Sequence, residues 1–304
     1  MRPRGMGEAT VTSELCCEVD FTPDQTANEG FRGESRFRFS IPGLDEERGN
    51  EIGEDEDGDL LLPRSRPKEF CISVRQSTRT PLARVGEQVW RGALYLADFL
   101  VSRGEALTDG VLLELGAGTG LTSVVAAALG ARHVVATDVD VGTILEQCRA
   151  NVEGNSSLLR GEIEVLGLDW TRPVEDQISL WPKDTREKLD SLRFIIAADV
   201  VYHNELTEAF MGTVTALFSL YPSIKAAFIA LEKRQVPCHA SFSPIRSQYV
   251  FTVEELDTVA PMYEYFVSLV RKLKGLKASV IEDEFQQFFC YQRTKELVLW
   301  KIER

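Results

Sequence analysis

The stretch that decides the fold is Val111-Leu112-Leu113-Glu114-Leu115-Gly116-Ala117-Gly118-Thr119-Gly120-Leu121. A short apolar run with one acid comes first, three glycines then alternate with small residues, and an alanine-rich helical pattern follows. This order predicts a strand, a tight turn and a helix. Glycine suits such a turn because its backbone reaches dihedral angles that a Cβ forbids and lets a ligand touch the main chain. The stretch therefore indicates a site for a nucleotide-like ligand.

The spacing of the glycines separates two classes of ligand. Dinucleotide sites use G-x-G-x-x-G, whose turn and helix N-terminus receive a pyrophosphate. Here the glycines stand as G-x-G-x-G, and Glu114 lies two residues before the first of them. A carboxylate at that position would repel a pyrophosphate and suits a cationic ligand. The alternative interpretation is a glycine-rich turn without a ligand.

Composition narrows the class of protein. The chain has 304 residues, of which 44% are hydrophobic, so it is long enough for a substantial core. Its net charge of -13 argues against a general nucleic-acid binder and is compatible with a basic protein substrate. No apolar stretch approaches the ~20 residues that cross a bilayer, and no apolar region follows the basic first residues. We therefore expect neither a membrane span nor a secretory signal.

Cysteine and histidine usage bears on compartment and on metals. The 6 cysteines include no C-x-x-C pair and no disulfide-like spacing, which favours a reduced intracellular compartment. With 3 histidines and no H-E-x-x-H pattern, no metal site is expected. Nucleus and cytoplasm fit the cysteines equally well.

Residues 1–67 are expected to form an acidic, partly disordered N-terminal extension. Nine acidic residues lie between Asp45 and Asp59 against the single Arg48, and such a run repels itself. Two alternating stretches, 11–21 and 31–41, are candidates for a pair of strands. The alternative to a variable extension is an acidic arm that helps to recruit a basic partner.

Residues 68–304 are expected to form one domain in which strands and helices alternate. Strands are expected at 70–76, 111–115, 133–137, 162–168, 194–198, 226–231, 278–281 and 297–302. Helices are expected from Trp90 to Val101 and at 121–129, 144–152, 206–220 and 253–273, a loop at 171–191, and a short piece at 288–291 without an assigned place. Such alternation predicts an α/β fold with a mainly parallel sheet covered on both faces.

In such sheets ligands bind at the carboxyl ends of the strands. Each strand exit here carries a polar marker: Glu114 with the glycine turn, Asp138, Asp169-Trp170, Asp199 and Glu232. Asp138 follows Gly120 by 18 residues, close to the ~20 at which an acid reaches ribose hydroxyls. Asp169 would accept a hydrogen bond from an adenine amine and Trp170 would stack on the base. Helix capping and core packing are the alternatives.

Four segments together resemble the landmarks of the family 16 seven-strand methyltransferases, many of which methylate lysines in proteins. They are Trp90-Arg91-Gly92-Ala93, the stretch from Glu114 to Gly120, Leu168-Asp169-Trp170 and Ala198-Asp199-Val200-Val201-Tyr202. The resemblance runs from about Phe70 to the C-terminus. It implies a Rossmann-like seven-stranded, mostly parallel sheet with helices on both faces and an antiparallel last strand.

The resemblance also implies S-adenosylmethionine as cofactor. The residues that it implies for cofactor contact are Trp90, Glu114, Gly116, Ala117, Gly118, Gly120, Asp138, Asp169, Trp170 and Ala198. It further implies that Asp199 and Tyr202 form an acid-x-x-aromatic motif at the mouth where a substrate lysine enters. Whether Asp199 would act as a base or would position the amine stays open at this point.

The nature of the acceptor also stays open. Nucleobase and amide methyltransferases resemble one another in an Asn/Asp-Pro-Pro-aromatic tetrapeptide, whereas Asp199-Val200-Val201-Tyr202 lacks proline, which disfavours adenine methylation. A protein lysine is the expected acceptor, on a basic or chaperone-associated partner. The alternatives are a methyltransferase acting on a small molecule or RNA, and a non-catalytic interaction protein. The resemblance favours a monomer in the nucleus, with the cytoplasm as the alternative.

Overall fold

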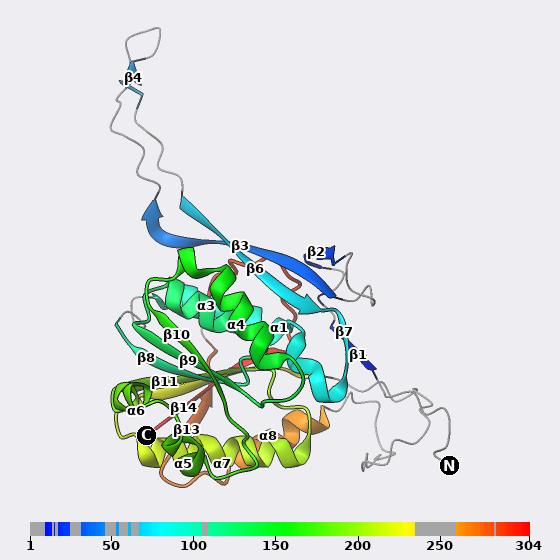
Figure 1. Ribbon diagram of the computed structural model, residues 1–304, viewed down its shortest axis with the longest axis vertical. Coiled ribbons are helices and arrows are strands. Elements are labelled where there is room, and N and C mark those ends of the chain that lie inside the picture. Colours follow the sequence, from blue (N-terminus) through cyan, green and yellow to red (C-terminus); the bar gives the residue numbers. More distant parts are fainter. Residues whose placement is uncertain are drawn as a thin grey trace.

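The computed structural model describes most of residues 67–304 and several segments before them (Figure 1). The described ranges are 10–13, 15, 18–24, 32–45, 53–54, 60–61, 67–104, 109–234, 260–282 and 284–304. Most of the acidic run between Asp45 and Asp59 lies outside them. The exceptions are Asp45 and β4 (Gly53–Glu54), which pairs with β5 (Leu60–Leu61).

A seven-stranded sheet forms the centre of the molecule, with the order β10-β9-β8-β11-β12-β14-β13. Its strands are β8 (Val111–Leu115), β9 (His133–Asp138), β10 (Glu162–Gly167), β11 (Leu192–Ala198), β12 (Ala226–Glu232), β13 (Lys277–Val280) and β14 (Leu297–Glu303). The first five are parallel, and β14 runs antiparallel to both β12 and β13. The α/β fold class and the antiparallel last strand expected from the sequence are confirmed.

Helices cover both faces of this sheet (Figure 1). One face carries α1 (Arg91–Ser102), α3 (Leu121–Ala128) and α4 (Ile144–Gly154), and the other carries α5 (Val174–Ser179), α6 (Lys183–Leu189), α7 (Asn204–Leu220) and α8 (Pro261–Val270). Side chains alternate along each strand, so neighbours enter opposite cores. In β8, Leu112 packs in the first core, while Leu113 and Leu115 pack in the second.

The loop expected at 171–191 is wrong, because this segment contains α5 and α6. Each helix begins directly after a proline, Pro173 or Pro182, whose fixed φ favours a helix start. Val174 and Ile178 of α5 and Leu189 of α6 are buried in the core below the sheet. Charged residues lie between these apolar positions, so the helical spacing was not recognised in the sequence. The helix expected at 253–273 is shorter, since α8 begins at Pro261, and residues 253–259 lie outside the described part of the chain.

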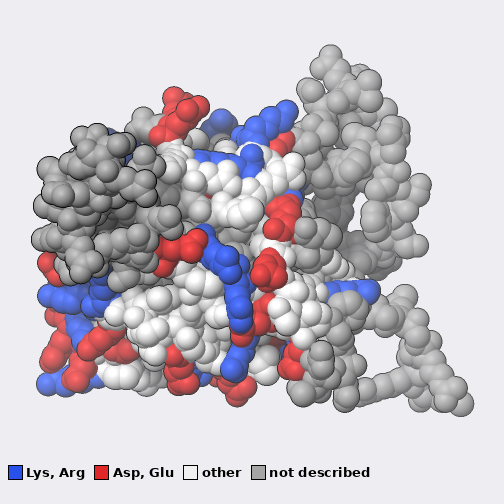
Figure 2. Space-filling model, turned by 90° about the horizontal axis from the view of Figure 1, so that it is seen from above, with Lys and Arg blue, Asp and Glu red and all other residues white. Residues whose placement is uncertain are grey.

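A second sheet lies above α3 and α4 (Figure 1). It consists of β2 (Asp20–Pro23), β3 (Arg32–Asp45) and β6 (Pro67–Ser77), while β1 (Thr10–Thr12) pairs with β7 (Arg79–Pro81). Of the stretch expected at 11–21, only the end lies in β2 and pairs with β3, while its start lies in β1 and pairs with β7. Phe37, Phe39, Ile72 and Val74 face the core that holds α1 and α3. Seen from above, basic and acidic side chains are interspersed over the described surface (Figure 2).

Two asparagines, Asn151 in α4 and Asn155 directly after it, join this helix to the second sheet. Asn151 accepts from the backbone N–H of Arg75 at 2.8 Å and donates to the Arg75 carbonyl at 3.0 Å. Asn155 does the same with Ser73, at 3.0 and 2.7 Å. Residues 73 and 75 of a strand direct their backbone groups to the same edge, and positions four apart on a helix share a face. The helix therefore supplies the missing partner for this edge of β6.

The short piece at 288–291, which had no assigned place, packs against α1. Buried Asp98 accepts from the backbone N–H groups of Phe288 and Phe289 at 2.7 and 3.0 Å and from the Tyr291 hydroxyl at 2.8 Å. Burial raises the pKa of Asp98 to about 6.

Within the described residues, no helix combines the length and apolar character needed to cross a bilayer.

Candidate active site

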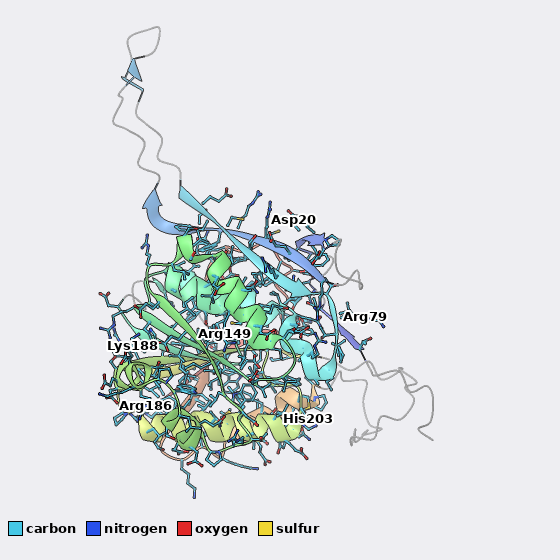
Figure 3. The ribbon with its side chains drawn as sticks, viewed as in Figure 1. Asp20, Arg79, Arg149, Arg186, Lys188 and His203 are labelled. Atoms are coloured by element: carbon cyan, nitrogen blue, oxygen red, sulfur yellow. The ribbon has the colours of Figure 1, made fainter. Side chains whose placement is uncertain are left out.

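A cavity opens at the carboxyl ends of the parallel strands. It holds about 690 Å³ of space, part of which is open solvent. Its wall contains ten of the residues singled out from the sequence: Trp90, Glu114, Gly116, Ala117, Gly118, Asp138, Trp170, Ala198, Asp199 and Tyr202. Gly120 and Asp169 are not among the described residues that line it. His203, the residue after Tyr202, marks the start of α7 at this end of the sheet (Figure 3).

The glycine turn forms the floor of the cavity, and each of its glycines has a positive φ. The angles are 75° at Gly116, 51° at Gly118 and 82° at Gly120. A Cβ would lie 2.8 Å from Val200 Cγ1 at Gly116 and 2.8 Å from the carbonyl oxygen of Gly86 at Gly118. At Gly120 it would lie 2.8 Å from Cys148 Sγ, so this glycine serves the packing of α3 on α4. The turn thus requires glycine for both conformation and space.

Glu114, one residue before the end of β8, is a buried acid. Its side-chain carboxylate accepts a short hydrogen bond from Ser123 Oγ on α3, and its backbone carbonyl accepts from Thr137 Oγ1 at 2.6 Å. Burial is the main reason that the pKa of Glu114 is raised to about 7, with a smaller contribution from the charge of Asp138. An acid held in this way gains from a cationic ligand, which would favour its charged form.

Asp138 ends β9 directly above the glycine turn. Its Oδ2 accepts from the Gly118 N–H at 2.8 Å and its Oδ1 from the Val139 N–H at 2.7 Å. Burial raises the pKa of Asp138 to about 6 despite these two donors. The carboxylate therefore stands in the cavity wall with lone pairs left for a diol, since each oxygen accepts one of these bonds.

Asp199 directly follows β11 and holds two other segments together. Its Oδ2 accepts from the Gly92 N–H at 2.7 Å, in the first turn of α1, and its Oδ1 accepts from the Glu232 N–H at 3.0 Å, at the end of β12. Asp199 has a φ of 51°, which is uncommon for a residue with a side chain. A Cβ at Gly92 would lie 2.6 Å from Asp199 Cγ. This geometry makes Asp199 a cap for α1, where a negative charge is stabilised.

Tyr202 and Trp90 provide aromatic surface at the cavity. Burial, with a contribution from the Asp138 charge, raises the pKa of Tyr202 to about 12, so its hydroxyl stays protonated. Trp90 Nε1 donates to the Val85 carbonyl at 3.0 Å, and the Arg234 guanidinium lies 4.4 Å from the centre of the Trp90 ring. The Trp90 ring is thus fixed at both its edge and its face.

Trp170 lies against the glycine turn, while Asp169 serves its own loop. A Cβ at Gly116 would lie 3.3 Å from the Trp170 ring, and this ring meets Phe210 of α7 edge-on at 5.2 Å. The buried Trp170 Nε1 has no hydrogen-bond partner among the described residues. Asp169 Oδ1 instead accepts from the Thr171 backbone N–H at 2.9 Å and the Thr171 hydroxyl at 2.6 Å. Its carboxylate therefore closes a turn beside Trp170.

Sequence reasoning missed the segment before Trp90. The short helix η2 (Leu82–Glu87) and the residues after it supply Ala83, Val85, Gly86, Gln88 and Val89 to the cavity wall. Buried Glu87 holds η2 in place, because it accepts two bonds from Arg84 at 2.7 Å and one from Thr143 at 2.8 Å. These bonds outweigh its burial, so the pKa of Glu87 is lowered. The sequence feature that could have indicated this segment is Gly86, whose carbonyl oxygen closely approaches Gly118 of the glycine turn.

Comparison with known proteins identifies methyltransferases as relatives of this chain. The profile of a family described as lysine methyltransferase matches residues 68–248. Methyltransferase-like protein 22 of Homo sapiens is 32% identical over 98% of this chain and 71% of its own length. The Mus musculus protein of that name is 33% identical over 76% of this chain and 58% of its own length. Protein N-lysine methyltransferase METTL21A of Xenopus tropicalis is 36% identical over 44% of this chain and 56% of its own length.

The family profile covers the η2 segment, the glycine turn, Asp138, Trp170 and the Asp199 corner in one continuous match. The human relative aligns with nearly the whole chain, including the strands before residue 68. The chain spans about three fifths of the mouse relative that it matches. From this profile match and this identity, the chain belongs to the lysine methyltransferase family.

Proposed function

We propose that this chain transfers a methyl group from S-adenosylmethionine to the side-chain amine of a lysine in a protein substrate. The observation that carries the proposal is the cavity at the strand ends, where Glu114, Asp138 and Tyr202 share one wall in a chain of the lysine methyltransferase family. Among the described residues, neither acid has a basic side-chain partner at hydrogen-bond distance, so both favour a cationic, hydroxyl-bearing ligand.

The residues present fit this cofactor. Cβ atoms at Gly116 or Gly118 would fill the floor of the cavity, so the turn keeps space against the main chain. Glu114 would face the amino group of the methionine part and Asp138 the ribose hydroxyls. The unpartnered indole N–H of Trp170 and its ring edge lie beside the turn, where a base would be placed. When bound, S-adenosylmethionine supplies an electrophilic methyl group on a sulfonium.

The protein's task toward the lysine is to remove its proton and align the amine. At pH 7 a lysine with a pKa of ~10.4 needs about 4 to 5 kcal/mol to become neutral. Burial against the Tyr202 and Trp90 rings would lower this cost, because an apolar wall disfavours the ammonium form. Excluding water and fixing the approach of the amine would account for much of the remaining acceleration.

Asp199 acts in this scheme as a positioning residue. Both oxygens of its carboxylate already accept backbone hydrogen bonds, from Gly92 and Glu232. These two bonds fix the carboxylate between α1 and β12, which supports a positioning role for Asp199. Its effect on the reaction would come through the segment that carries Trp90, two residues before Gly92.

The experiment that tests the proposed activity uses tritiated S-adenosylmethionine, the purified chain and a cell extract, with Asp138→Ala as control. Proteins, nucleic acids and small molecules are separated, and labelled proteins are hydrolysed to amino acids. Label in methyl-lysine that requires intact Asp138 is the expected result. Label confined to RNA or metabolites, or in methyl-arginine, would replace this acceptor with another. Cofactor binding without transfer to any acceptor would make the chain an interaction protein.

We further propose that the substrate is a basic or chaperone-associated protein and that the chain acts as a monomer in the nucleus. The net charge of -13 supports a basic partner. The resemblance to family 16 methyltransferases supports the rest. Sedimentation of the purified chain tests the monomer, microscopy of the tagged chain tests the compartment, and mass spectrometry of labelled bands identifies the substrate.

A further inference from the structure

The segment Gln88–Arg91 links the cavity to the N-terminal part of the chain. Gln88, Val89 and Trp90 line the cavity, and α1 starts at Arg91. The segment has an extended backbone at Gln88 and Trp90, so its own helix and strand bonds do not fix it. Whatever holds this segment therefore sets the position of one cavity wall.

Three contacts to this segment come from residues 10–18. Ser13 Oγ donates to the Val89 carbonyl at 2.6 Å, and both residues are buried. Gln88 Nε2 donates to the Val11 carbonyl at 3.0 Å. The carboxylate of Glu18 pairs with the Arg91 guanidinium, whose other nitrogen lies 3.1 Å from Glu232 Oε1. Each residue from 88 to 91 except Trp90 is thus held by one group of the N-terminal part.

These N-terminal residues are themselves firmly placed. Thr10–Thr12 pairs with β7, directly before η2, and the Leu15 side chain is 1% exposed within the core of α1 and α3. The second oxygen of Glu18 accepts from the Gln292 N–H at 2.8 Å. The charge of Arg91 and two donors hold the pKa of Glu18 below its usual range, so this acid stays charged. Residues 10–13, 15 and 18 are named the N-terminal brace below.

We propose that the N-terminal brace is a positioning element for the cofactor wall, so that cofactor affinity depends on residues far outside the glycine turn and the strand ends. The brace lies before residue 68, where the match to the family profile begins. The argument rests on the proposed use of S-adenosylmethionine. It predicts that removing a brace contact shifts Gln88–Arg91 and weakens cofactor binding, while the glycine turn and Asp138 stay intact.

The test is isothermal titration of S-adenosylmethionine into the full chain, into Ser13→Ala and into Glu18→Gln. We expect the dissociation constant to rise about fivefold to twentyfold in each variant and further in the double variant, with recovery in Glu18→Asp. KM for the cofactor should rise more than kcat falls. The matched control is Arg36→Gln, an exposed residue of the second sheet that makes no contact with this segment, and its affinity should equal that of the parent.

A second control separates positioning from general loss of stability. Asn155→Ala removes bonds to the edge of β6 and should lower the melting temperature without a comparable change in affinity. Glu18→Gln provides a variant that folds even if Ser13→Ala does not, because Glu18 is partly exposed. Affinities within twofold of the parent in both brace variants would overturn the proposal. Failure of the parent to bind the cofactor would instead refute the proposed function.

Discussion

The two walls of the cavity are built in different ways. The floor and one wall, from Glu114 to Gly120 with Asp138, come from one strand-turn-helix unit and the end of the next strand. A second wall, residues 83–90, is held by contacts from Val11, Ser13 and Thr143, and from Asp199 through Gly92. The first wall is local in sequence, and the second depends on long-range contacts.

This difference has a physical consequence. The shape of the local wall depends on backbone conformation, because positive φ angles and close neighbours permit only glycine at positions 116 and 118. The shape of the long-range wall depends instead on hydrogen bonds between segments that are distant in the sequence. A single substitution in the local wall should therefore cause a large loss of cofactor affinity, whereas a single substitution in the other wall should cause a smaller loss.

The largest effect is expected for Gly118→Ala in the local wall. The added Cβ would lie 2.8 Å from the Gly86 carbonyl oxygen at a φ of 51°. Strain and the close contact together cost about 4 kcal/mol, or roughly 1,000-fold in affinity for S-adenosylmethionine. Titration calorimetry measures this change. Gly212→Ala, where nothing lies within 4 Å, is the control and should bind as the parent does; an equal loss there would undo the assignment to the turn.

Asp199→Ala should have the next largest effect, on the stability of the folded protein and on kcat. The backbone N–H groups of Gly92 and Glu232 would lose their acceptor, which costs about 3 kcal/mol of stability. Chemical denaturation measures this loss, and kcat should fall with it. Asp199→Asn keeps one acceptor and should lie between. A positioning role leaves the pH profile of kcat unchanged in Asp199→Asn, whereas loss of a titrating limb would identify a base.

Glu114→Gln is expected to make the unliganded protein more stable at high pH and to weaken cofactor binding. The pKa of Glu114 is raised from 4.5 to about 7 by burial, so the folded chain binds this proton more tightly than the unfolded chain does. The unliganded protein must then lose stability as pH rises through this window, by about 3 kcal/mol in total. Glu114→Gln should remove most of this loss and weaken cofactor binding. Melting temperatures at pH 5 and pH 8 measure it, and parallel curves for parent and variant would contradict it.

The smallest effect is expected for Arg234→Gln in the long-range wall. The Arg234 guanidinium lies 4.4 Å from the Trp90 ring centre, and such an exposed contact contributes below about 1 kcal/mol. Cofactor affinity should change by less than about fivefold in calorimetry. A much larger loss would show that this cation contacts the ligand or substrate itself.

The sequence predicted the local wall well because its signals are themselves local. Strand ends in a parallel sheet meet at one edge, so Glu114, Asp138 and Asp199 were placed together from their positions in the chain. Asp169, whose carboxylate closes its own turn, and Gly120, which packs on Cys148, are not among the described residues that line the cavity. A marker at a strand end specifies the edge but not the direction of the side chain.

The rest was not predictable from pattern alone. The brace contacts join residues more than 70 positions apart, such as Ser13 and Val89, and no periodicity reports them. The charged stretch at 171–191 was interpreted as a loop, although Pro173 and Pro182 mark two helix starts. The two bonds to Asp199 also depend on which backbone groups β12 and α1 present, which follows from packing.

The most direct test of this account is calorimetric titration of S-adenosylmethionine into the full chain beside Asp138→Ala. Asp138 stands between the two walls, bonded to the Gly118 N–H and within reach of η2. The account predicts one binding site in the parent and a loss of at least roughly 100-fold in affinity in the variant, at about 3 kcal/mol. Equal affinity in both proteins, or no binding by the parent, would contradict it.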